Sequence, residues 1–122
     1  MPSQRFSKSQ RVRRRSEFQH AFKAGYRVSS RYFTLILTPG DRPASRLGIV
    51  ASRKLGDAVH RNRAKRLIRE VFRQLDTLPA AGVDVIVIPR RELFDAPFSD
   101  LERDFRTAWR RGLARLQPAH AG

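Results

Sequence analysis

Cysteine is absent from the 122 residues, which excludes a disulfide framework, a thiolate metal site and a cysteine nucleophile. Histidine occurs only three times, and the spacing of His20, His60 and His120 fits no zinc motif. Long apolar runs are also lacking, because the longest, such as residues 83–88, are far too short to span a bilayer. The basic N-terminus has no apolar stretch typical of a secretory signal. We therefore expect a cytoplasmic protein with no membrane contact and no metal site or cofactor of its own.

Acidic residues are scarce. Eleven Asp and Glu face 26 Lys and Arg, which gives a formal net charge of +15. Such a charge opposes compaction unless a polyanion offsets it, and the candidates are nucleic acid, an anionic membrane surface or an acidic protein. Hydrophobic residues make up 40% of the chain, which suffices for one domain with a modest core. The composition thus predicts a small globular protein with an anionic partner.

Hydrophobic periodicity and end signals predict three helices. Two of them open with a capping box, formed by Ser16 with Gln19 and by Ser99 with Glu102. Asp57 is expected to be the N-cap of the helix between these two. The helices are expected between residues 16 and 25, from 58 to about 75, and from 99 to 118.

Aromatic and branched residues predict strands at residues 32–38, 46–53 and 83–88. The strand–helix–strand passage from residue 46 to 88 has the length of a parallel crossover. The expected fold class is α/β, as a small two-layer sandwich with a mixed central sheet of about four strands and three helices.

The helix at 58–75 has two unlike faces. A turn of 3.6 residues gathers an apolar stripe for the core, made of Ala64, Leu67, Ile68, Val71 and Leu75. The roughly opposite side is basic and polar, with Asn62, Lys65, Arg66, Arg69 and Arg73, while Arg61 and Arg63 project to either side of Asn62. A merely solvated face normally mixes signs, whereas Glu70 is the only acid here. Arginine binds phosphate at two points and stacks on bases. This helix and the net charge favour nucleic-acid binding over an ordinary solvated face.

Other candidate residues leave two interpretations open. Phe18 and Phe22 lie one helical turn apart, so they either belong to the core or floor a groove in which bases stack. The pairs Arg53-Lys54 and Arg90-Arg91 each follow a strand, and either rim one edge of the sheet or are ordinary surface charge. Trp109 lies within a full apolar stripe and is expected in the core.

Residues 55–69 resemble the Arg-Asn-Arg motif of the bacterial ribonuclease P protein. The matching segment is Leu55-Gly56-Asp57-Ala58-Val59-His60-Arg61-Asn62-Arg63-Ala64-Lys65-Arg66-Leu67-Ile68-Arg69. Residues 18–25 resemble the first helix of that family, and residues 46–55 and 83–91 resemble the strands on either side of the motif helix. The resemblance covers roughly residues 11–116 as a single domain. It leaves residues 1–15 as a basic arm, which overlaps the start of the domain, and 117–122 as a tail. A run of one charge sign is typical of arms that contact nucleic acid, and the arm's accessory basic residues are Arg11, Arg13, Arg14 and Arg15.

The resemblance implies an uncommon left-handed strand–helix–strand crossover, against the general preference for the right-handed form. It also implies that the basic face of the motif helix meets a catalytic RNA. A central cleft would take the single-stranded 5′ leader of precursor tRNA, and its matching residues are Phe18, Phe22, Ile36, Arg53, Lys54 and Arg90. Two positions depart from the family: Ala64 replaces a larger aliphatic residue, and Ile36 stands where some members have an aromatic.

No convincing protein active site is visible in the sequence. A general acid–base pair of His20 and His60 is conceivable but is the weaker interpretation. The resemblance implies instead that the RNA subunit holds Mg²⁺ and performs the hydrolysis, with two metals positioning the attacking water. The protein would act as a monomer in a 1:1 complex with that RNA. The main alternative is a structural RNA-binding protein of ribosomal or assembly type, and a nonspecific DNA-binding protein is a weaker third.

Overall fold

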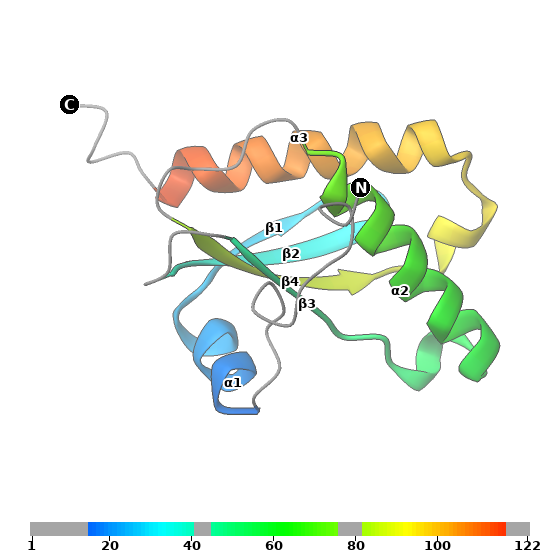
Figure 1. Ribbon diagram of the computed structural model, residues 1–122, viewed down its shortest axis with the longest axis horizontal. Helices are drawn as coiled ribbons and strands as arrows, with labels where there is room; N and C mark the ends of the chain where they lie inside the picture. The colour runs from blue at the N-terminus through cyan, green and yellow to red at the C-terminus, as the bar shows by residue number, and fades with distance from the viewer. Residues whose placement is uncertain (1–14, 41–44, 76–81, 117–122) are drawn as a thin grey trace, which may run out of the picture.

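The computed structural model describes residues 15–40, 45–75 and 82–116, and the architecture below refers to these ranges. Four strands form one sheet in the order β1-β2-β4-β3. Helix α1 covers one face of the sheet, while α2 and α3 lie together on the other (Figure 1). The helices are α1 (Arg15–Ala24), α2 (Ala58–Arg73) and α3 (Phe98–Leu116). The strands are β1 (Tyr26–Ser29), β2 (Phe33–Pro39), β3 (Arg46–Ile49) and β4 (Val83–Pro89). The small α/β fold with a mixed sheet is confirmed.

The ends of the helices follow local sequence signals in part. Helix α1 ends before Gly25, whose N–H donates to the Ala21 carbonyl at 2.8 Å. Asp57 is the N-cap of α2, as predicted, because its carboxylate accepts the His60 N–H at 3.1 Å. Both predicted capping boxes are wrong, since Ser16 and Ser99 lie inside α1 and α3 instead of preceding them.

The parallel pairing of β3 and β4 confirms that the strand–helix–strand passage is a parallel crossover. Strand β2 is antiparallel to both β1 and β4, whereas β3 is parallel to β4. Strand β1 was not predicted, because four residues with alternating exposure carry too weak a signal. Strand β3 ends at Ile49 and not at Arg53. The chain then forms a short 3₁₀ turn, η3 (Arg53–Leu55), and a second such turn, η4 (Arg91–Asp95), follows β4.

The main core lies between the sheet and the pair α2 and α3. Its rings meet edge to face, with centroids 5.3 Å apart for Phe33 and Phe105 and 5.9 Å apart for Phe72 and Trp109. Trp109 is buried, as predicted. A second, smaller cluster lies under α1 and consists of Ala21, Ile36 and Ile86, with Phe18, Val50 and Ile88 packed against it.

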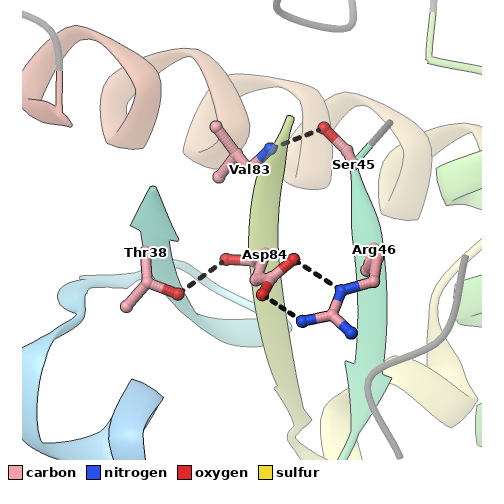
Figure 2. A network of polar contacts seen from close by, with 5 residues as sticks. All are labelled: Thr38, Ser45, Arg46, Val83 and Asp84. Atoms are coloured by element: carbon pink, nitrogen blue, oxygen red, sulfur yellow. Dashed lines mark hydrogen bonds and ion pairs between the residues drawn. The ribbon is translucent and has the colours of Figure 1, made fainter. Parts of the chain in front are cut away.

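A buried ion pair joins the parallel strands on the α1 side of the sheet (Figure 2). Arg46 on β3 donates to both carboxylate oxygens of Asp84 on β4, at 3.0 and 2.6 Å. Nearby, Ser45 Oγ accepts the Val83 N–H at 3.0 Å. A charge as buried as that of Arg46 requires such a partner, and removal of either member would leave the other uncompensated. Arg46 is therefore a structural residue among the many basic ones.

Candidate RNA-binding surface

The outward face of α2 carries every predicted motif residue at the surface. The core side is Ala64, Ile68, Val71 and Phe72, all buried. Of the seven predicted RNA-binding residues, Asn62, Arg63, Arg66 and Arg73 are exposed, and Arg61, Lys65 and Arg69 are half-buried. We call these seven residues the α2 basic face. Its side chains come from consecutive turns of one helix, so the guanidinium groups form a continuous positive surface suited to phosphate.

The start of α2 is fixed by a local polar arrangement. Gly56 adopts a φ of 126°, a conformation that favours glycine. The Asp57 carboxylate accepts the His60 N–H and lies 2.8 Å from His60 Nδ1. These hydrogen bonds from His60 hold the pKa of Asp57 below its ordinary value. The arrangement fixes where α2 begins, so Arg61 and Asn62 follow shortly after a charged N-cap.

Arg73 and Arg63 of α2 each contact another side chain, Arg73 within the helix and Arg63 in η4. Arg73 forms an ion pair with Glu70, the only acid of the helix, so its charge is partly offset. The Arg63 guanidinium lies 5.8 Å from the ring centroid of Phe94 in η4, within the range of a cation–π contact. Phe94 also meets the His60 ring edge to face, with centroids 5.4 Å apart. Phe94 was missed in the sequence, where nothing links η4 to α2.

Basic residues gather beyond the carboxyl ends of the parallel strands. Arg53 and Lys54 in η3 follow β3 and are exposed, and Arg90 follows β4 and is exposed too. Because β3 and β4 are parallel neighbours, these residues come to the same edge of the sheet. Arg90 Nη2 donates to Thr34 Oγ1 at 3.4 Å, which draws this side chain across β2 on the α1 side. The structure thus brings these residues to one edge of the sheet, and their role as a basic rim stays a prediction.

The two phenylalanines of α1 differ in burial. Phe18 is half-buried and packs on the small cluster with Ile36 and Ile86, whereas Phe22 is 43% exposed. A Cβ added to Gly48 would lie 3.0 Å from the Phe18 ring, so glycine in β3 lets α1 approach the sheet. Ile36 is only 1% exposed. It supports α1 from below and offers no open surface to a ligand, so the structure gives it a packing role.

The remaining predicted residues lie partly outside the described ranges. Arg11, Arg13 and Arg14 lie outside the described residues, while Arg15 is the first residue of α1 and is exposed. Among residues 15–40, 45–75 and 82–116, no three His, Asp or Glu side chains are grouped as metal ligands. No helix in these ranges combines the length and the apolar character that crossing a membrane requires.

Comparison with known proteins gives one consistent result. The sequence profile of a family described as Ribonuclease P matches residues 6–112. The chain is 40% identical over 88 residues to the ribonuclease P protein component of Thermotoga petrophila, covering 72% of this chain and 75% of that one. It is 30% identical over 107 residues to the protein of the same name from Clostridioides difficile, covering 87% and 94%.

Solved structures agree with the sequence relatives. The RNase P protein from Thermotoga maritima matches with a TM-score of 0.70 and 35% identity, over 78% of this chain and 90% of that one. The Staphylococcus aureus RNase P protein matches with a TM-score of 0.74 and 32% identity, over 84% and 94%.

Proposed function

The chain belongs to the ribonuclease P protein family and is a ribonuclease P protein component. On that premise we propose that it binds the catalytic RNA subunit together with the 5′ leader of precursor tRNA. It thereby assists endonucleolytic removal of the leader. The observation that carries the proposal is the α2 basic face. Seven basic or polar side chains of α2 reach the surface, and the only acid of this helix is paired with Arg73. A structural RNA-binding protein with no linked enzyme needs no such pattern and is not favoured.

The α2 basic face is the proposed contact with the RNA subunit. Guanidinium groups bind phosphate through charge-assisted hydrogen bonds, and the asparagine adds a donor and an acceptor. Because this binding releases counterions, the logarithm of the affinity falls linearly with the logarithm of the salt concentration. The slope is proportional to the number of phosphates neutralised. The protein thereby lowers the repulsion between two large RNAs, in a complex that we propose to be 1:1.

The leader is proposed to lie on the α1 side of the sheet. Phe22 presents a partly exposed ring there, and Phe18 forms part of the surface beneath. The rim of Arg53, Lys54 and Arg90 would contact the phosphates of the leader. An unpaired base can stack on an exposed aromatic ring, while duplex RNA cannot offer its base faces in this way. This combination supports single-stranded RNA as the ligand of this face.

Hydrolysis is proposed to take place on the RNA subunit, which would bind Mg²⁺ for in-line attack by water. The protein contributes binding and orientation and no catalytic residue. Of the two described histidines, His60 is engaged by Asp57 at the start of α2, and His20 is exposed on α1. The basic residues Arg11, Arg13, Arg14 and Arg15 are proposed as accessory contacts to the RNA.

The test is cleavage of a leader-bearing precursor tRNA at low Mg²⁺ by the protein alone, the RNA subunit alone, and both together. We expect efficient leader release from the mixture only. Tight RNA binding without any gain in cleavage would favour the structural RNA-binding alternative. Leader release by the protein alone would place the active site in the protein and contradict the proposal.

Phe22 gives a sharper test of the leader face. Phe22→Ala should weaken binding of leader-bearing precursor about tenfold, since stacking on one base contributes roughly 1–3 kcal/mol. Affinity for mature tRNA and for the RNA subunit should stay unchanged. Phe22→Trp keeps a stacking surface and should retain binding, whereas Phe22→Leu should not. Equal losses for precursor and RNA subunit would contradict the assignment of the leader to this face.

A further inference from the structure

Helix α3 carries a second group of arginines on the side turned away from its buried residues. Arg103, Arg106 and Arg110 fall within about 60° of one another around the helix axis. Arg103 and Arg110 are exposed and Arg106 is half-buried. We call these three residues the α3 arginine stripe. We propose that this stripe binds the phosphate backbone of a double-stranded segment of the catalytic RNA subunit, an inference that rests on the proposed function above.

Partners within the protein do not account for the stripe. Asp100 and Glu102 stand three and four residues before Arg103 and Arg106, a spacing that permits ion pairs on a helix. In the described part of the chain no such pair forms, and none of the three arginines has a hydrogen-bond partner. The next acid, Asp104, is engaged elsewhere: it accepts from Ser30 Oγ at 2.7 Å and from the Tyr32 N–H at 3.0 Å.

Helix stability does not account for the stripe either. Positive charge stabilises a helix only near its last turn, because the effect of the dipole falls off within that turn. In α3 that position is held by Arg115, which donates to the Tyr26 hydroxyl at 2.9 Å and lies over its ring. Arg103 and Arg106 lie two and more turns earlier. Three positive charges at these positions repel one another without any gain for the helix.

Arg106 adds an unsatisfied donor. Its Nε is covered by the protein and finds no acceptor among the described residues. Such groups are rare in folded proteins and call for a specific explanation. The terminal nitrogens of the same guanidinium are not buried in this way, so they remain accessible to a phosphate. An anion bound there would add charge-assisted hydrogen bonds to a group that already has one donor unpaired.

The chemistry of the face points to duplex backbone. The other exposed residues on this side of α3 are Ser99, Thr107 and Ala114, with Arg111 at its margin, and none of them is aromatic. Without a ring for stacking, single-stranded bases find no platform, whereas duplex RNA is recognised through its shape and its phosphates. A membrane surface fits poorly, because stable interfacial binding needs apolar side chains and those of α3 are buried against the sheet.

The position of the stripe selects the RNA subunit over the precursor. Helices α2 and α3 lie on the same face of the sheet and cross where Phe72 meets Trp109 (Figure 1). The leader is proposed to lie on the opposite face, beside α1. An RNA that binds the α2 basic face can therefore extend over α3 without passing the sheet.

The experiment compares three full-length proteins for binding to the RNA subunit from the same organism. The test variant is Arg103→Gln/Arg106→Gln/Arg110→Gln. The matched control, Lys23→Gln/Arg27→Gln/Arg31→Gln, removes the same charge from exposed positions elsewhere. We expect the test variant to lose about tenfold or more in affinity at 0.1 M salt. Its salt slope should fall by about 2.7, since each of three duplex phosphates contributes roughly 0.9. The control should lose much less.

Further measurements separate the possible failures. The double variant Arg103→Gln/Arg110→Gln leaves the covered Arg106 in place and should reproduce most of the loss, so a folding defect cannot mimic the result. Equal losses in test and control variants would overturn the inference. Weaker binding of precursor tRNA with unchanged affinity for the RNA subunit would also overturn it. If the wild-type protein neither binds the RNA subunit nor stimulates cleavage, the proposed function fails first, and this inference fails with it.

Discussion

Helices α2 and α3 pack on the same face of the sheet, yet they distribute their charge in opposite ways. Helix α2 has no acid in its first turn and carries Arg61 and Arg63 close to its N-terminus, where the helix dipole disfavours positive charge. Helix α3 has Asp100 in its first turn and Arg115 in its last, as the dipole favours. Folding explains the charges at both ends of α3, and it also explains Asp57 at the cap and Arg73 in the last turn of α2, but it does not explain Arg61 and Arg63. Positive charge that a helix does not need for its own stability is thus the better indicator of a binding surface.

The comparison predicts that the α2 basic face can be neutralised with a large loss of binding and no loss of stability. The variant Arg61→Gln/Arg63→Gln/Arg66→Gln should weaken RNA-subunit binding on the order of 100-fold at 0.1 M salt, since each phosphate contact contributes roughly five- to eightfold there. Filter binding at several salt concentrations measures this together with the slope. The control triple variant at Lys23, Arg27 and Arg31 should change little. Unchanged affinity of the α2 variant would contradict the role of this face.

Asp104 of α3 should show the reverse, so that its removal lowers stability and leaves RNA binding unchanged. Asp104 accepts from Ser30 Oγ and from the N–H groups of Arg31 and Tyr32, and so holds the turn between β1 and β2 against α3. Asp104→Ala leaves these donors without their partner, and should lower the free energy of unfolding by about 1–3 kcal/mol. Urea denaturation measures this, with Glu102→Ala as the control expected to change it by less than about 0.5 kcal/mol. RNA affinity under folding conditions should not change. A larger loss for the control would show that the turn is not held by Asp104.

A smaller effect tests the dipole argument at the two helix ends. Arg61→Gln removes positive charge near the start of α2, and should raise the free energy of unfolding by roughly 0.3 kcal/mol or more at low salt. Arg115→Gln removes charge from the last turn of α3 together with the bond to Tyr26, and should lower it by about 1 kcal/mol. Added salt should shrink the part of both changes that comes from charge. A decrease in both variants would show that side-chain packing, and not the dipole, decides stability at Arg61.

The sequence could predict those parts of the molecule that follow from a period or from a long local motif. The faces of α2, its cap at Asp57 and the burial of Trp109 follow from residues close together in the chain. The parallel crossover follows from the length of the passage between two predicted strands. The contacts that set the site depend on residues far apart. Phe94 meets α2 only through the path of η4, and Phe18 reaches Gly48 only because α1 packs on this face of the sheet. Ile36 was expected to line the cleft. Its burial under α1 likewise depends on packing between segments that are distant in the sequence.

The smallest predicted effect concerns the cap that offsets the charge of α2. Hydrogen bonds from His60 lower the pKa of Asp57 below its ordinary value of 3.8. Because the unfolded chain takes up this proton more readily, the folded state gains stability above that ordinary value and loses it as the pH falls through the lowered pKa. Asparagine caps a helix as well as aspartate but does not titrate. Asp57→Asn should therefore unfold close to wild type at pH 7 and lose less stability between about pH 5 and pH 3, in thermal unfolding followed by circular dichroism. Equal acid sensitivity of the two proteins would mean that the charge on Asp57 does not contribute to holding the start of α2, and that its hydrogen bonds alone offset the unfavourable arginines.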